Sequence, residues 1–126
     1  MGLVNGIHHV SMKCTKEELD RVTDFYYRIL GLEIVRRWAD GVMFAAGNEL
    51  IEIFSTATEK NGMGVIRHFA FATDDVDACV EAVRNAGYEV IIGPKDIVIP
   101  SEPYLAARMA FCFGPLGEEI EFFCER

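Results

Sequence analysis

An internal repeat is the feature that most constrains the fold of this 126-residue chain. Each copy has a histidine on one short apolar strand and a glutamate on another. The first copy contains Ile7-His8-His9-Val10 and Ile51-Glu52-Ile53-Phe54, and the second contains Ile66-Arg67-His68-Phe69 and Ile120-Glu121-Phe122-Phe123. A polar linker, residues 55–64, separates them. Two such strand-rich half-units, at about 5–55 and 65–124, are expected to lay their sheets together, so we predict a single domain over 1–126.

Each half-unit is predicted to run strand, helix, strand, strand, strand. In the first half-unit, Thr15 and Glu18 form a capping box that starts a helix, and Gly31 suits the left-handed residue that ends it. In the second half-unit, Gly93-Pro94 predicts a turn between two short strands. The predicted fold class is therefore α+β, with two tandem β-α-β-β-β units forming a curved mixed sheet around a cleft.

The composition favours small molecules as partners. Asp and Glu outnumber Lys and Arg by 20 to 12, giving a formal net charge of −8, whereas a nucleic-acid surface needs clustered cations. No apolar run approaches the roughly 20 residues of a membrane span, and the N-terminus lacks the pattern of a secretory signal. We therefore expect a cytoplasmic protein with its four cysteines reduced and with no nucleic-acid or membrane partner.

Side chains alternate between the two faces of a strand, and this decides which residues of the repeat can meet. His9 shares a face with Lys13, whereas His8 points to the other face and aligns with Arg67 of the second copy. The two adjacent histidines are therefore not expected to enter the cleft together. A single histidine at the start of a strand is more often a polar residue with an ordinary structural role than a ligand.

The two glutamates of the repeat are harder to explain without a cation. Glu52 and Glu121 occupy matched places in apolar strands, where an ionised carboxylate is costly unless it is paired or bound to a metal. Together with His9 and His68 they offer two imidazole nitrogens and two carboxylates. This set suits Zn²⁺, Co²⁺ or Ni²⁺ and fits poorly with Ca²⁺, which prefers oxygen ligands alone. We therefore predict a metal-binding cleft in which these four residues hold one divalent ion.

Several segments of the chain together form a family signature. They are Ile7-His8-His9-Val10, Phe25-Tyr26 before Ile29-Leu30-Gly31-Leu32, Ile51-Glu52-Ile53-Phe54, Arg67-His68-Phe69-Ala70-Phe71 before Asp75-Val76-Asp77, and Gly114-Pro115-Leu116-Gly117 before Glu118-Glu119-Ile120-Glu121. Through them the chain resembles the vicinal oxygen chelate superfamily, the fold of glyoxalase, bleomycin-resistance and extradiol-dioxygenase proteins, over nearly its whole length. Within the superfamily it is most similar to glyoxalase I, lactoylglutathione lyase, because that enzyme has a glutamate at the position of Glu52.

The resemblance implies a lyase that isomerises the hemithioacetal of methylglyoxal and a thiol, glutathione or similar, to an S-lactoyl thioester. It implies that His9, Glu52, His68 and Glu121 bind the metal, and that Glu121 or Glu52 moves a proton from C1 to C2. It also implies Ni²⁺ or Co²⁺ as the preferred ion, with Zn²⁺ as a further candidate. We expect a homodimer whose sites take their ligands from one chain or from two.

Two departures from the family pattern keep other hypotheses open. The first is in residues 114–117, which read Gly-Pro-Leu-Gly where the family commonly has Asp-Pro-Asp-Gly. The second concerns glutathione, whose carboxylates need cationic partners in the protein. We take Lys13 and Arg108 as the candidates for substrate binding. One alternative is another metal-dependent member of the superfamily, of the epimerase or fosfomycin-resistance type. The other is a metal-free protein of the same fold that sequesters a drug-like molecule and would not need both histidines and both glutamates.

Overall fold

The structure is a computed structural model that describes residues 3, 7–60, 64, 66 and 68–126. Its contacts divide the chain into two units, Met1–Asn61 and Gly62–Arg126, and each unit has its own four-stranded sheet. The boundary between the units falls within the predicted linker. Arg67 and the residues at which the predicted half-units begin, 5 and 65, lie outside the described residues.

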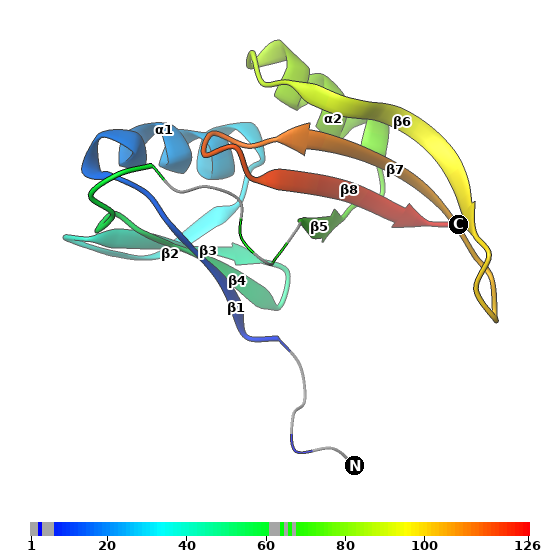
Figure 1. The fold of residues 1–126 in the computed structure, drawn as a ribbon, viewed down its shortest axis with the longest axis horizontal. Coiled ribbons are helices and arrows are strands. Elements are labelled where there is room, and N and C mark those ends of the chain that lie inside the picture. The colour runs from blue at the N-terminus through cyan, green and yellow to red at the C-terminus, as the bar shows by residue number, and fades with distance from the viewer. Residues whose placement is uncertain (1–2, 4–6, 61–63, 65, 67) are drawn as a thin grey trace. The chain divides into compact units, whose positions relative to one another are not determined.

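The first unit places a helical segment on one face of a mixed sheet (Figure 1). Its elements in chain order are β1 (His9–Lys13), the 3₁₀ turn η1 (Lys16–Glu18), α1 (Leu19–Asp24), the π-helical turn η2 (Phe25–Ile29), β2 (Glu33–Trp38), β3 (Gly41–Ala46) and β4 (Glu49–Phe54). The strands lie in the order β1-β4-β3-β2. β1 runs parallel to β4, because the helical segment carries the chain back across the sheet, and the other neighbours are antiparallel.

The helical segment begins and ends where the sequence predicts. Thr15 and Glu18 form the capping box, in which Glu18 Oε1 accepts a hydrogen bond from the Thr15 backbone N–H at 2.9 Å. The Thr15 hydroxyl also donates to Glu18 Oε1 at 3.1 Å. Gly31 follows with φ of 76°, the left-handed conformation that glycine adopts without strain. The sequence does not predict the last turn, in which the Leu30 N–H donates to the carbonyl of Phe25, five residues back.

The core of the first unit lies between the helical segment and the sheet. Phe25 and Tyr26 are fully buried, and the Tyr26 ring packs against Phe44 of β3 with the ring centroids 5.6 Å apart. Ile53 of β4 is also fully buried on this side. Because side chains alternate along a strand, Glu52 points to the opposite face of the sheet.

The second unit repeats this arrangement with a regular helix. Its elements are β5 (Phe69–Ala72), α2 (Val76–Asn85), β6 (Val90–Ile99), β7 (Leu105–Phe113) and β8 (Glu119–Glu125). The strands lie in the order β5-β8-β7-β6, with β5 parallel to β8. Asp75 caps α2 by accepting a hydrogen bond from the Ala78 backbone N–H at 3.0 Å. Val80 and Val83 of α2 are buried, as is Phe122 of β8, so Glu121 points away from the helix.

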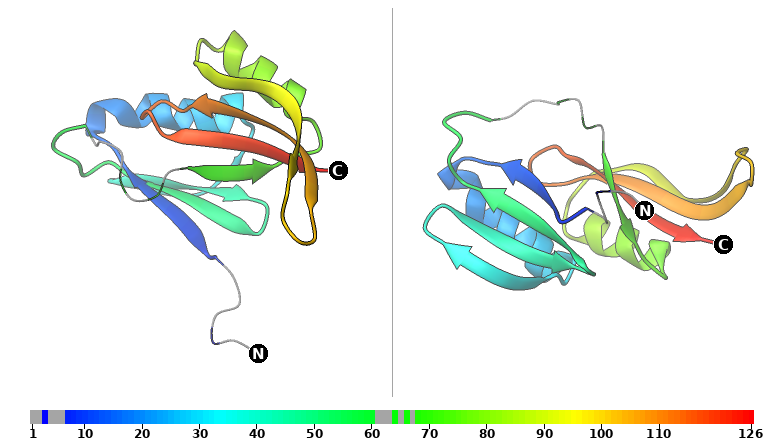
Figure 2. Two further views of the ribbon diagram at one scale, coloured as in Figure 1. Left: turned by 45° about the vertical axis from the view of Figure 1, so that its right-hand side comes forward. Right: turned by 90° about the horizontal axis from the view of Figure 1, so that it is seen from below.

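β6 corrects one sequence prediction. Gly93 and Pro94 lie within a single strand and not in a turn between two strands. The pairing of β6 with β7 shifts register between Val90 and Ile92 and again between Ile92 and Lys95. Proline has no N–H to donate, so an irregular stretch of an edge strand is where a sheet accommodates it, and β6 is an edge strand. The two strands form one long curved hairpin (Figure 2).

Both units therefore have the predicted β-α-β-β-β order, and the α+β fold class is confirmed. Within the described part of the chain, no helix has the length and apolar character needed to cross a lipid bilayer.

Candidate metal-binding pairs

In the first unit, β1 and β4 place a histidine beside a glutamate. The parallel register sets Ser11 opposite Glu52, and His9 lies two residues before Ser11 on the same face. His9 Nε2 lies 3.6 Å from Glu52 Oε1. The side chain of His9 is 41% exposed and that of Glu52 only 13%. The imidazole is therefore accessible, while the carboxylate beside it is mostly buried.

The second unit builds an equivalent pair from β5 and β8. Ala70 lies opposite Glu121, and His68 lies two residues before Ala70, as His9 does before Ser11. His68 Nε2 lies 3.3 Å from Glu121 Oε1, and the two side chains are 41% and 12% exposed. The two copies of the repeat thus produce the same pair with nearly the same exposure. Each unit therefore brings one predicted histidine to one predicted glutamate, and the sharing of one ion by all four residues stays a prediction.

Each glutamate of these pairs has an apolar neighbour on the adjacent strand. Met43 of β3 is the register partner of Glu52, and Phe111 of β7 is the register partner of Glu121. Among the described residues, the ion pair recorded for each carboxylate is with its own histidine. A largely buried carboxylate in such surroundings is stabilised by a nearby cation or hydrogen-bond donor.

The separation of the paired atoms fits a shared divalent ion. Donor atoms about 2.1 Å from one ion lie roughly 3.0 Å apart at a right angle and roughly 3.4 Å apart at a tetrahedral angle. The observed 3.6 and 3.3 Å are close to these values. Within the described residues of either unit, no three His, Cys, Asp or Glu side chains are grouped to hold a metal. One pair supplies two ligands, so a four-ligand site requires both pairs.

His8 contacts His9, although strand alternation predicts that the two adjacent side chains point to opposite faces. Its Nδ1 is 3.0 Å from Nδ1 of His9, and the two rings meet edge to face with centroids 5.2 Å apart. His8 precedes the first residue of β1, so the strict alternation of a strand does not constrain it. In the second unit the rings of His68 and Phe111 instead meet edge to face, with centroids 5.0 Å apart.

The two cations predicted to bind substrate lie in different places. Lys13 is at the end of β1, on the face of His9, and its register partner is Phe54. Arg108 of β7 is three residues from Phe111, the register partner of Glu121, and so lies on the face that α2 covers. We therefore do not place Arg108 at the candidate site.

Arg108 is also occupied by two carboxylates. Its guanidinium donates to Asp77 of α2 at 2.7 and 2.9 Å and to Asp96 of β6 at 3.2 Å. These hydrogen bonds from Arg108 hold the pKa of the Asp77 carboxyl below its usual range. The same contacts raise the pKa of Arg108, which is already charged at neutral pH. Arg108 therefore joins α2 to its sheet.

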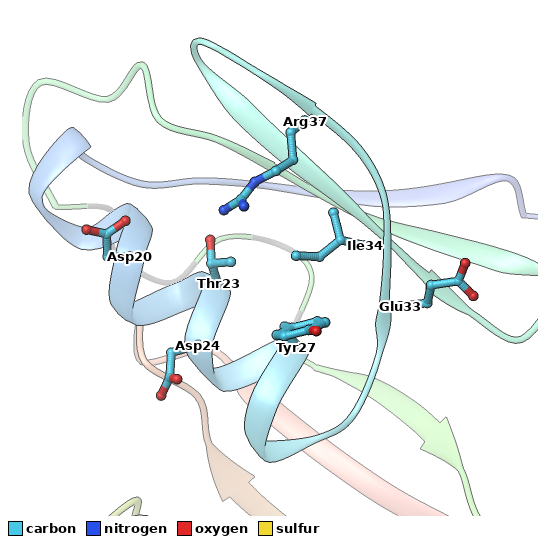
Figure 3. Close-up of a pocket in the computed structure, with 7 residues that line it drawn as sticks. All are labelled: Asp20, Thr23, Asp24, Tyr27, Glu33, Ile34 and Arg37. Carbon is cyan, nitrogen blue, oxygen red and sulfur yellow. The ribbon is translucent and has the colours of Figure 1, made fainter.

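A surface cavity of about 700 Å³ lies elsewhere in the first unit, between the helical segment and β2 (Figure 3). It is lined by Asp20, Thr23, Asp24, Tyr27, Glu33, Ile34 and Arg37. Ile34 and Arg37 are the register partners of Phe44 and Val42, which are buried on the helical side of the sheet. The cavity is thus on the face opposite Glu52, and none of the predicted site residues lines it.

Comparison with known proteins decides the family. The sequence model of the Glyoxalase/Bleomycin resistance protein/Dioxygenase superfamily matches residues 6–122. The chain belongs to this superfamily. The uncharacterized protein YaeR of Escherichia coli (strain K12) is a relative that is 28% identical over 130 residues, covering 93% of this chain and 94% of YaeR.

Solved structures that share the fold carry different functions in their names. A lactoylglutathione lyase from Agrobacterium tumefaciens is 19% identical, with a TM-score of 0.70 and coverage of 98% of this chain and 96% of that protein. TnmS3, an antibiotic binding protein from Streptomyces sp. CB03234, is also 19% identical, with a TM-score of 0.74 and full coverage of both chains. These likenesses establish the fold, and the choice between catalysis and binding depends on the side chains of the site.

Proposed function

We propose that this member of the superfamily is a metal-dependent lyase of the glyoxalase I type, which isomerises the hemithioacetal of methylglyoxal and a thiol to an S-lactoyl thioester. The observation that carries the proposal is the duplicated histidine–glutamate pair, with both carboxylates mostly buried and both imidazoles accessible. The proposal requires His9, Glu52, His68 and Glu121 to share one divalent ion. The ligands would come from one chain or from two chains of a homodimer.

The donor set suits Ni²⁺, Co²⁺ and Zn²⁺ alike, because imidazole nitrogen and carboxylate oxygen suit these borderline ions, and our preference for Ni²⁺ or Co²⁺ rests on the resemblance to glyoxalase I. When bound, the ion supplies Lewis-acid stabilisation of the negative charge that develops on the substrate oxygens. The protein residues then have two tasks, which are to hold the ion and to move one proton.

The proton is moved by one of the two glutamates. A carboxylate of Glu121 or Glu52 takes the proton from C1 of the hemithioacetal and returns it at C2, so the product is an isomer and no oxidant or reductant is consumed. Met43 and Phe111, the apolar register partners of these residues, limit the access of water to the carboxylates. This favours return of the same proton over its loss to solvent.

Lys13 is the cation that we propose for an acidic group of the thiol, because it lies on the face of His9. Cytoplasmic location and a homodimer remain predictions from the sequence. The likeness to TnmS3 keeps a second candidate function, metal-free binding of an antibiotic-like molecule. Another metal-dependent enzyme of the superfamily, of the epimerase or fosfomycin-resistance type, is a further alternative.

Metal analysis combined with an activity assay tests the proposal. Full-length protein would be stripped with a chelator, reloaded with Ni²⁺, Co²⁺ or Zn²⁺ and assayed with methylglyoxal and several low-molecular-weight thiols. We expect one ion per chain and isomerisation in the Ni²⁺ or Co²⁺ form. A protein that takes up none of the three ions would leave the binding function. A loaded protein that is inactive with every thiol would favour another enzyme of the superfamily.

A further inference from the structure

The contact between His8 and His9 has no counterpart described in the second unit and has no role in the function proposed above. The Nδ1 atoms of the two rings are 3.0 Å apart, within hydrogen-bond range, while Nε2 of His9 is 3.6 Å from Glu52 Oε1. A neutral imidazole carries one N–H and one bare nitrogen, so His9 donates from one of its two nitrogens.

The two distances favour one tautomer of His9. A proton on Nε2 would face a carboxylate oxygen that is too far for a good hydrogen bond, whereas a proton on Nδ1 has an acceptor at 3.0 Å. With the proton on Nδ1, the bare Nε2 and Glu52 Oε1 lie side by side, as two ligands of one cation would. This is the form of histidine that binds a metal, since a ligating histidine usually donates its other N–H to a fixed partner.

We infer that His8 is a positioning residue: its Nδ1 accepts the Nδ1–H of His9 and so keeps Nε2 of His9 unprotonated and directed toward the ion shared with Glu52. The inference rests on the proposed function for the ion and goes beyond it by assigning His8. His68 differs, because the orienting contact described for its ring is an edge-to-face contact with Phe111. The effect of His8 is therefore confined to the first pair.

Two substitutions of His8 separate the hydrogen bond from the ring contact. His8→Phe keeps an aromatic ring beside His9 but removes the acceptor. His8→Asn restores an acceptor, because its side-chain oxygen takes nearly the position of the imidazole Nδ1. Phe111→Leu is the matched control in the second unit, since it removes an aromatic contact from His68 and leaves His9 untouched.

The first readout needs no metal. Long-range ¹⁵N–¹H NMR of the histidine rings, recorded on the stripped protein at about pH 8 where imidazoles are mostly neutral, reports which nitrogen carries the proton. We expect the Nδ1–H form for His9 in the wild-type protein, in His8→Asn and in Phe111→Leu, and a mixture of both forms in His8→Phe. An unchanged His9 tautomer in His8→Phe would overturn the inference.

The second readout is Ni²⁺ affinity, measured by competition with a chelator. We expect His8→Phe to weaken binding roughly 10-fold, the lower end of the effect of outer-shell partners, and His8→Asn to stay within about threefold of wild type. Wild-type affinity in His8→Phe would refute the inference while leaving the proposed function intact. A wild-type protein that binds no Ni²⁺ would refute the proposed function, and the tautomer measurement would then still decide whether His8 orients His9.

Discussion

The two histidine–glutamate pairs are alike in the exposure of their side chains and differ in the ring that contacts each histidine. The glutamates differ in exposure by only one percentage point, 13% for Glu52 and 12% for Glu121, and both histidines are 41% exposed. Yet His9 contacts a second imidazole, and His68 contacts a phenylalanine. The surroundings differ while the pair itself is repeated, which supports the proposal that the pair binds the metal.

The helices that cover the two sheets differ as well. The first unit uses a 3₁₀ turn, a six-residue α-helix and a π-helical turn, whereas the second uses one regular helix of ten residues. Both arrangements return the chain to a strand parallel to the one it left. The strand pairing that brings histidine to glutamate therefore tolerates different helices, because the register of two parallel strands sets it.

The largest difference between the two pairs is expected in the turnover of variants that lack one glutamate. Glu121→Gln and Glu52→Gln should both weaken metal binding. The variant that lacks the proton-transferring carboxylate should in addition lose about 10²- to 10⁴-fold in turnover when the metal is bound, and we expect this additional loss for Glu121→Gln. Steady-state kinetics at saturating Ni²⁺ would measure it. Glu119→Gln is the control, since Glu119 lies on the same face of β8 outside the pair. Equal losses in both pair variants would show that neither glutamate acts alone.

The cores of the two units should be equally sensitive to truncation. Phe44 and Phe122 are buried almost completely, at 0% and 1% exposure, one in each unit. Replacing either with alanine should lower the free energy of unfolding by about 3–5 kcal/mol, through lost burial and a cavity. Chemical denaturation followed by circular dichroism would measure this. A small effect for one variant alone would mean that its unit repacks more easily.

The two histidines should matter equally for metal affinity. His9→Ala and His68→Ala each remove one imidazole, and we expect each to weaken Ni²⁺ binding by at least roughly 100-fold, more than the outer-shell effect of changing His8. Chelator competition would measure the affinities. If one alanine variant bound Ni²⁺ as wild type does, the corresponding pair would lie outside the metal site.

Two cysteines of the second unit should differ in reactivity. Burial raises the pKa of the Cys112 thiol to about 12, so at pH 8 it stays protonated, and the thiolate is the reactive form. Cys124, near the end of β8, is only partly buried. Iodoacetamide labelling read by mass spectrometry should modify Cys124 at least about tenfold faster than Cys112. Fast labelling of Cys112 in the folded protein would indicate frequent opening of the core under α2.

The smallest effect is expected for the ion pair between Asp77 and Arg108. The pKa of Asp77 is lowered in the folded protein, so this contact stabilises the fold above the ordinary carboxyl pKa of 3.8 and is lost as pH falls through the lower folded value. Asp77→Asn should slightly lower the denaturation midpoint at pH 7 and lower it less at about pH 2, well below the ordinary carboxyl pKa. Lys16→Met, which removes the Lys16–Asp40 pair of the first unit, is the comparison. An equal loss at both pH values would mean that Asp77 acts through packing.

The sequence predicts much of this fold because the signals are local. The capping box at Thr15 and Glu18 and the left-handed Gly31 each depend on a few neighbouring residues, and both are confirmed. The shared face of His9 and Glu52 follows from strand alternation once the two strands pair. The superfamily is confirmed as well, whereas the metal, the substrate and the homodimer stay predictions.

The features that the sequence does not predict depend on distant partners or on irregular backbone. Arg108 meets Asp77, which is 31 positions away, only because α2 packs across β7. Pro94 suggests a turn, and its strand continues only because the irregular pairing lies at a sheet edge. His8 reaches His9 because it stands just before the first residue of the strand.

The central claim, that the two pairs share one ion, is tested most directly by nickel K-edge X-ray absorption of the loaded protein together with its metal content. We predict one nickel per chain with two imidazole nitrogens in its coordination shell. Two nickel ions per chain with one imidazole each would show that the pairs bind separately, and would contradict the account.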